Sequence, residues 1–155
     1  MAEVALIVGS KSDVAAAKGA LDVLDRFGVG WEASVCSAHR APERLRRVIQ
    51  EAEDAGTRVF IAGAGMAAAL PGAVASMTTR PVVGVPLASG ALNGIDALLA
   101  IAQMPPGIPV ATVAINGAAN AAYLAIEILA VNDAQLTAKL ADWRKEQSQR
   151  IDTFE

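Results

Sequence analysis

Short apolar runs alternate with segments of helical spacing along the whole chain of 155 residues. Residues 4–8 form a continuous apolar run closed by Gly9, which is typical of a strand buried on both faces. Residues 13–27 follow with apolar side chains at helical spacing, and Gly28 provides the stop signal. The same order recurs along the chain, so the sequence predicts five β-α units in one parallel sheet.

The other expected elements follow from the same signals. The expected strands cover residues 31–36, 58–62, 81–85 and 110–115. The expected helices cover residues 42–55, 67–77, 93–102 and 118–130, and a polar C-terminal helix follows at about 133–150. With right-handed crossovers, this pattern predicts a three-layer α/β fold, a doubly wound parallel five-stranded sheet of the flavodoxin-like order. No linker or repeat interrupts it, so we expect one domain over residues 1–155.

Composition excludes several classes of function. Apolar residues make up 54% of the chain and charged residues 19%, and alanine fills 34 of the 155 positions. This many small apolar side chains favours closely packed helices and a homo-oligomer. One cysteine and one histidine cannot build a disulfide scaffold or the usual zinc site, so we expect no metal. A net charge of -3 gives no general footprint for nucleic acid.

Membrane attachment is not expected either. The N-terminus lacks the basic region of a signal peptide, and its apolar run is soon broken by Lys11 and Asp13. The longest apolar helix, residues 118–131, contains Asn120 and Glu127 and is shorter than the ~20 residues that span a bilayer. We therefore expect a soluble, cytoplasmic protein.

The loops that follow the five expected strands have an unusual composition. In an open parallel sheet, ligands bind beyond the carboxyl ends of the strands, where these loops meet. Hydroxyls, bases, glycines and one acid gather there, in residues 9–13, 37–42, 63–67, 86–90 and 116–118. The sequence therefore predicts a binding site at this edge of the sheet.

The first of these loops suits a phosphorylated ligand. Ser10 and Ser12 lie just before a helix, where hydroxyls and exposed N–H groups bind phosphate well. Asp13 repels phosphate, so its functional role would be to accept hydrogen bonds from ribose hydroxyls. The alternatives are that Ser12 only caps the helix and that Asp13 only complements the helix dipole.

The second loop provides a proton carrier. His39 is the only histidine, and histidine is the side chain that exchanges protons most readily near neutral pH. It follows a strand directly and lies between Ser37 and Arg40, whose guanidinium suits phosphate or carboxylate. The alternatives are a surface or capping histidine and a solvated arginine. The position at the ligand edge favours function for both.

The third loop is rich in small residues. Gly63, Ala64 and Gly65 begin a near match to the dinucleotide fingerprint G-x-G-x-x-[GA], but the next acid is Asp96, too far to hold a ribose. We interpret the glycines as allowing close backbone approach to a smaller ligand. No phosphate-binding G-x-x-x-x-G-K-[ST] loop is present, and Cys36 is interpreted as a core residue rather than a nucleophile.

Together these motifs resemble the N5-carboxyaminoimidazole ribonucleotide mutases of purine biosynthesis. The similarity covers essentially the whole chain, in order and with similar spacing. Arg40, rather than the lysine of the related class that uses free carbon dioxide, favours the mutase class. The matching motifs are residues 9–13, 37–40, 62–65, 70–72, 84–86 and 103–110.

This resemblance implies an isomerase without cofactors, typically a homo-octamer. It would move a carboxyl group from the exocyclic nitrogen of aminoimidazole ribonucleotide to ring carbon 4, by decarboxylation and recarboxylation. His39 matches the family's proton shuttle. The positions that match ribose and phosphate contacts are Ser10, Ser12, Asp13, Ser37 and Arg40, and the backbones of Gly63, Ala64 and Gly65 match contacts to the base and carboxylate.

Three positions depart from the family pattern. Ala69 stands where a second histidine is usual, Met66 where glycine is usual, and Val14 where tryptophan is often found. The mutase is the main hypothesis, because His39 is retained. The alternatives are a carboxylase that uses free carbon dioxide and a ribonucleotide-binding member without catalytic activity.

Overall fold

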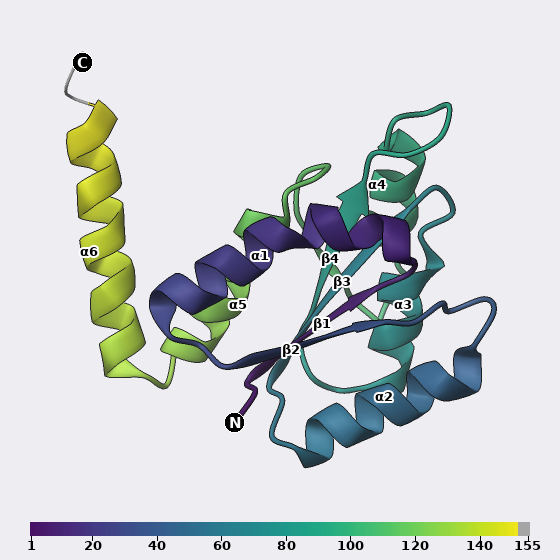
Figure 1. Ribbon diagram of the computed structural model, residues 1–155, viewed down its shortest axis with the longest axis horizontal. Coiled ribbons are helices and arrows are strands. Elements are labelled where there is room, and N and C mark those ends of the chain that lie inside the picture. The colour runs from purple at the N-terminus through teal and green to yellow at the C-terminus, as the bar shows by residue number, and fades with distance from the viewer. Residues whose placement is uncertain (152–155) are drawn as a thin grey trace.

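The computed structural model describes residues 1–151, in which five strands form one parallel sheet in the order β2-β1-β3-β4-β5 (Figure 1). The strands are β1 Val4–Val8, β2 Trp31–Val35, β3 Val59–Gly65, β4 Val82–Leu87 and β5 Ala111–Thr112. The helices are α1 Val14–Phe27, α2 Pro42–Asp54, α3 Ala69–Met77, α4 Ile95–Ala102, α5 Ala118–Ala130 and α6 Ala134–Ile151, with a 3-10 helix at Lys11–Asp13. This strand order confirms the expected flavodoxin-like fold. Residues 152–155 of the expected domain lie outside the described residues.

Helices cover both faces of the sheet. Successive strand side chains point to opposite faces. On one face, Leu6 and Ile61 pack in an apolar cluster with α1 and α5. On the other, Ile7 and Phe60 pack with α2, α3 and α4. The three-layer arrangement follows from strands that are apolar on both sides.

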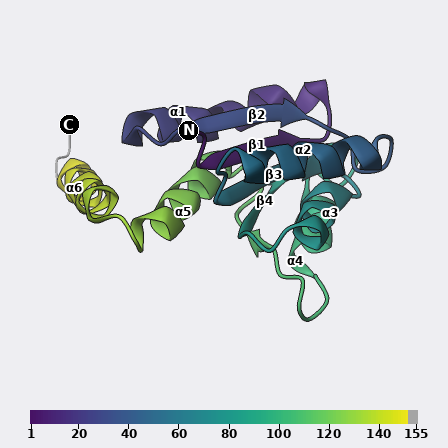
Figure 2. The same ribbon diagram turned by 90° about the horizontal axis from the view of Figure 1, so that it is seen from below.

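The last helix stands apart from these layers. Figures 1 and 2 both show α6 beyond α5, away from the sheet. Asp133 accepts a hydrogen bond from the Leu136 N–H at 3.0 Å, which caps the start of α6. Trp143 then stacks on Tyr123 of α5, with ring centroids 6.0 Å apart. Among residues 1–151 we find no helix with the length and apolar character to cross a membrane.

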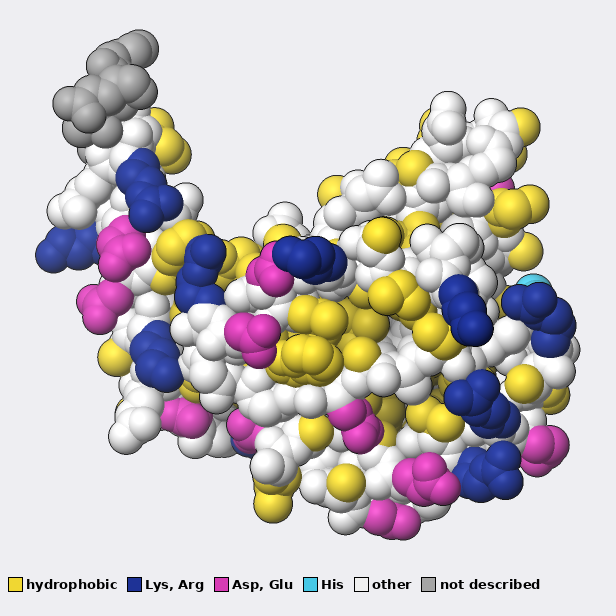
Figure 3. Space-filling model, viewed as in Figure 1, with side chains coloured by type: hydrophobic (Ala, Val, Ile, Leu, Met, Phe, Trp, Pro, Cys, Tyr) yellow, Lys and Arg dark blue, Asp and Glu magenta, His cyan; other side chains and the backbone are white. Residues whose placement is uncertain are grey.

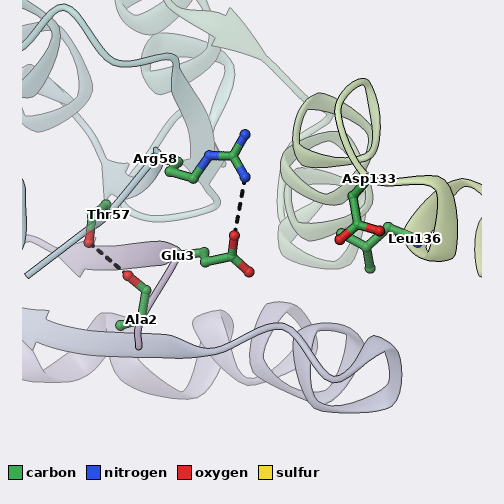
Figure 4. A network of polar contacts seen from close by, with 6 residues as sticks. All are labelled: Ala2, Glu3, Thr57, Arg58, Asp133 and Leu136. Carbon is green, nitrogen blue, oxygen red and sulfur yellow. Dashed lines mark hydrogen bonds and ion pairs between the residues drawn. The ribbon is translucent and has the colours of Figure 1, made fainter.

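Polar contacts hold the amino ends of β1 and β3 together. The Thr57 hydroxyl donates to the Ala2 carbonyl at 3.4 Å, and the Arg58 guanidinium pairs with Glu3 at 3.2 Å (Figure 4). These contacts lie at the edge opposite the carboxyl ends of the strands. The amino ends of β1 and β3 are thus fixed at one edge of the sheet. The opposite edge, at the carboxyl ends of the strands, is left for ligand-binding loops.

Several elements differ from their expected bounds, and the differences in β3, α3 and β5 bear on the site or the sheet edge. β3 continues past Ala62 to Gly65, because β4 pairs with it as far as Leu87. α3 begins two residues later than expected, since Met66 and Ala68 both have positive φ and cannot continue a right-handed helix. β5 spans two residues instead of six, because it lies at the sheet edge and pairs only with β4.

Candidate active site

A cavity of about 220 Å³ opens at the carboxyl ends of β1, β2 and β3. β1 lies between β2 and β3, so the order in which strands are added to the sheet reverses at β1. Doubly wound folds bind ligands at this switch point. We call residues 9–13 and 37–40 the polar wall of this cavity, and residues 64–70 its apolar wall. The lining residues are Gly9, Asp13, Ser37, Ala38, His39, Ala64, Gly65, Met66, Ala67, Ala68, Ala69 and Leu70.

Hydrogen bonds organise the first part of the polar wall. The Ser10 hydroxyl donates to Asp13 Oδ2 at 2.9 Å and lies 2.5 Å from the Ser12 hydroxyl oxygen. The Asp13 N–H donates to the Ser10 carbonyl at 3.1 Å, which closes a tight turn before α1. Ser12 does not cap the helix, because its hydroxyl is bonded to Ser10 instead. Asp13 lines the cavity, and the two serines stand beside it.

The loop between β2 and α2 forms the second part of the polar wall. Ser37 Oγ accepts the Arg40 N–H at 3.2 Å and the Arg40 Nε–H at 3.4 Å. The terminal guanidinium nitrogens of Arg40 make no ion pair with any of residues 1–151. Arg40 follows the lining residue His39 but does not itself line the cavity. One side of its guanidinium is held in place by Ser37, and the other is available to an anion.

His39 is exposed at the cavity and makes no hydrogen bond to the described part of the chain. In Figure 3 the histidine, coloured cyan, lies at the right-hand margin beside a basic side chain. Both imidazole nitrogens are therefore available to a ligand. This is the placement that a proton carrier needs.

The predicted glycine-rich segment lies partly in the sheet. Gly63 is buried between β1 and β4 and does not line the cavity; its carbonyl accepts the Gly9 N–H at 3.3 Å. Ala64 and Gly65 do line it. A Cβ at Gly65 would lie 3.0 Å from Ser89 Cβ and 3.2 Å from the Leu87 carbonyl oxygen. Glycine is needed there because the loop after β4 approaches so closely.

The sequence places residues 66 and 67 in a loop at the ligand edge, but it does not single out any of residues 66–70 as a site residue. Residues 66–70 line the cavity directly after β3. Met66 has φ +52° and Ala68 has φ +44°, and the Ala68 N–H donates to the Gly65 carbonyl at 3.0 Å. The one available signal was a methionine directly after the Gly-Ala-Gly motif.

The two walls offer different chemistry. The polar wall contributes a carboxylate, hydroxyls, a guanidinium and an imidazole, which suit a phosphorylated sugar and a proton transfer. The apolar wall contributes backbone groups and mostly small apolar side chains, which suit the uncharged part of a ligand. Among the described residues, 1–151, no three His, Cys, Asp or Glu side chains gather as a metal site would require.

A cavity at the switch point of a doubly wound sheet, with one acid–base side chain beside it, defines an α/β enzyme of flavodoxin-like fold. The family model described as AIR carboxylase matches residues 3–150, and the chain belongs to this family. The resemblance found in the sequence motifs is thereby confirmed.

Relatives and solved structures agree with this assignment. The chain is 53% identical over 146 residues to the N5-carboxyaminoimidazole ribonucleotide mutase of Pyrococcus abyssi, covering 94% of this chain and 84% of that protein. It is 49% identical over 152 residues to the protein of the same name from Escherichia coli K12, covering 97% and 90%. The crystal structure of Treponema denticola PurE superposes with a TM-score of 0.88 and 28% identity, covering 96% of this chain and 92% of that one.

Proposed function

We propose that this protein is an isomerase of de novo purine biosynthesis, converting N5-carboxyaminoimidazole ribonucleotide to 4-carboxy-5-aminoimidazole ribonucleotide. The observation that carries the proposal is the cavity at the β1/β3 switch point, which has His39 and Asp13 in its polar wall and small apolar residues in its other wall. Relatives that are about half identical over nearly the whole chain carry the mutase name.

The polar wall suits the ribonucleotide end of the substrate. In the proposal, Arg40 and the Ser10–Ser12 turn bind the phosphate. The Asp13 carboxylate accepts hydrogen bonds from the ribose hydroxyls, and the Ser37 hydroxyl donates one to the ribose. Charge supports the role of Arg40, since its guanidinium attracts the phosphate.

The base and its carboxyl group then lie toward the apolar wall. The backbones of Ala64 and Gly65 lie against the base and its carboxyl group in this proposal. Gly63, the preceding residue, lies in the sheet behind the cavity and supports them. No cofactor enters this reaction scheme, because the substrate carries its own carboxyl group.

His39 carries the proton. When the N–C bond of the carbamate breaks, the exocyclic nitrogen takes up one proton and carbon dioxide is released. When carbon dioxide then bonds to ring carbon 4, that carbon loses one proton. The net proton change is zero, so a single imidazole that donates and then accepts suffices. This is why Ala69, in the apolar wall where the family usually has histidine, is compatible with turnover.

The test is turnover of freshly made N5-carboxyaminoimidazole ribonucleotide by the purified protein, with and without bicarbonate, with direct detection of the 4-carboxylated product. The mutase predicts product without bicarbonate. Product from aminoimidazole ribonucleotide only when bicarbonate is added would support the carboxylase. Ribonucleotide binding with no product under either condition would support the binding member and contradict the proposal.

We further propose a cytoplasmic homo-octamer built from the single domain of residues 1–155. Exposed apolar side chains on and before α4 support association, since Leu92 is 58%, Ile95 58% and Leu99 51% exposed. The cavity is also smaller than the ~300 Å³ at which ligand pockets usually begin. Light scattering should give eight times the chain mass of 15.9 kDa; a monomer would contradict this part of the proposal.

A further inference from the structure

The loop before α2 and the first half of α2 carry a local excess of positive charge. Residues 39–50 contain four arginines and one acidic residue, Glu43, in a chain whose net charge is -3. Three of these arginines lie in α2, and we call Arg44, Arg46 and Arg47 the α2 arginines. All three are exposed. Since α2 follows the polar wall in the chain, this charge lies next to the wall that suits a phosphorylated ligand.

None of the α2 arginines is neutralised by a neighbour. They form no ion pair and no side-chain hydrogen bond with any of residues 1–151. Glu43 precedes Arg47 by four residues, a spacing at which opposite charges on a helix can pair, but these two side chains do not. Exposed charges of one sign without partners produce a potential that extends into the solvent.

The order of charges along α2 does not favour the helix. Acidic residues near the start of a helix and basic residues near its end stabilise the helix dipole. Apart from Glu43, α2 has the reverse order: its arginines lie in the first half, its last turn has no basic residue, and Glu51, Glu53 and Asp54 lie near its end. The α2 arginines therefore stabilise α2 neither through the dipole nor through ion pairs, which indicates a role outside the helix.

The α2 arginines lie close to the ligand cavity. α2 begins at Pro42, three residues after His39, which lines the cavity. Because a helix rises ~1.5 Å per residue, Arg47 is about 7–8 Å along the axis from that start, and helical side chains lean toward the start. This separation is comparable to the Debye length of ~8 Å at physiological ionic strength, so screening is incomplete. Figure 3 shows Lys and Arg side chains gathered around the histidine at the right-hand margin, where α2 begins in Figure 1.

We propose that the α2 arginines form a capture surface for the anionic ribonucleotide. Their field attracts the substrate from solvent and raises its concentration at the polar wall, where Arg40 then binds the phosphate. The inference rests on the proposed function and adds to it three residues that touch no reacting atom. The substrate suits such a surface, because its phosphate and its carboxyl group are both negatively charged. Surfaces of one sign can raise association rates by about 10–10³-fold.

The experiment measures kcat/KM for N5-carboxyaminoimidazole ribonucleotide at about 20 mM and about 500 mM sodium chloride. In the variant with Arg44→Gln, Arg46→Gln and Arg47→Gln, kcat/KM should fall by about five- to tenfold at low salt and by less than about twofold at high salt, since salt screens the attraction. The value of kcat should not change, because the reacting atoms keep their contacts. Each single substitution should have a smaller effect than Arg40→Ala, because Ser37 holds none of the α2 arginines.

Three controls separate charge from structure. Lysine at the same three positions keeps the charge and should retain the wild-type kcat/KM at both salt concentrations. Arg80→Gln removes an exposed arginine without an ion pair among the described residues, just before β4 at the opposite edge of the sheet, and should leave kcat/KM unchanged. Thermal unfolding should show the glutamine variant to be at least as stable as the wild type, because its charges no longer oppose the helix dipole.

Each outcome decides between the claims. Wild-type kcat/KM in the glutamine variant at both salt concentrations would overturn the inference and leave the proposed isomerase intact. A loss that persists at high salt, or an equal loss in the lysine variant, would also overturn it, because long-range attraction depends on charge and is screened by salt. An equal loss in Arg80→Gln would replace local capture by the overall charge of the protein. No 4-carboxylated product from the wild type would overturn the proposed function, and the inference with it.

Discussion

The polar and apolar walls of the cavity are built in opposite ways. In the polar wall, side chains hold one another: Ser10 bonds to Ser12 and Asp13, and Ser37 bonds to Arg40. The side chains of the apolar wall have no hydrogen-bonding groups of the kind found in the polar wall. Its shape is held by the backbone, with positive φ at two non-glycine residues. Hydrogen bonds between side chains organise the polar wall. In the apolar wall, the surrounding sheet holds two residues in strained backbone conformations.

This difference matches the two tasks of the proposed reaction. A phosphorylated sugar needs charge and directional hydrogen bonds, which prearranged side chains provide. A transient carbon dioxide needs a dry surface held close to the base, which a tight turn of small residues provides. We therefore expect substitutions in the polar wall to change binding or proton transfer, and substitutions in the apolar wall to change stability or coupling.

The largest effect is expected at His39. His39→Asn removes the proton carrier while keeping a polar side chain of similar shape, so turnover should fall by about 10²–10⁴-fold. Ribonucleotide affinity should change little, as measured by calorimetry. Full activity of His39→Asn would contradict a catalytic role for the polar wall.

A smaller effect is expected at Arg40. Arg40→Ala should weaken ribonucleotide binding by about tenfold, because one charge-assisted contact to phosphate is lost. Arg46→Ala is the matched control, since it removes the same charge from an exposed position on α2 that has no hydrogen bond to Ser37. Equal losses in the two variants would mean that general charge, and not the Ser37-held guanidinium, attracts the phosphate.

Ser10 tests whether the hydrogen bonds within the polar wall matter. Ser10→Ala removes the bonds to Ser12 and Asp13 and should weaken ribonucleotide binding by about three- to tenfold. The free energy of unfolding should change by less than about 1 kcal/mol, because the turn is partly exposed. Unchanged affinity would show that the turn binds the ligand without this preorganisation.

The smallest effect is expected at Ala68, and it is a gain. Ala68→Gly relieves a left-handed residue with φ +44° and should raise the free energy of unfolding by about 0.5–1 kcal/mol in urea titrations. Ala67→Gly, one residue earlier and without positive φ, should bring no gain. Destabilisation of Ala68→Gly would contradict strain in the apolar wall.

The two walls also differ in how well the sequence predicts them. The alternation of apolar runs and helical spacing was enough to predict the order of elements and the flavodoxin-like topology, because strands buried on both faces have a distinct pattern. The same reasoning placed residues 9–13 and 37–40 at one edge. Polar side chains directly after buried strands are unusual, so they mark a site.

The apolar wall was harder to predict, for two physical reasons. The glycines in the segment 63–65 predict a loop after a strand that ends at residue 62, whereas β3 continues to Gly65 because β4 pairs with it as far as Leu87. The positive φ values of Met66 and Ala68 depend on that extension and on the close approach of Ser89 to Gly65, which are tertiary contacts. Local propensity favours a helix through these residues, and α3 begins only at Ala69.

The most direct test of this account is a crystal structure of His39→Asn with 4-carboxy-5-aminoimidazole ribonucleotide bound. We predict that the phosphate lies at Arg40 and the Ser10–Ser12 turn, and that the carboxylated base lies against residues 64–70. A ligand bound outside this cavity, or with its base toward Arg40 and its phosphate against the apolar wall, would contradict the division of labour proposed for the two walls.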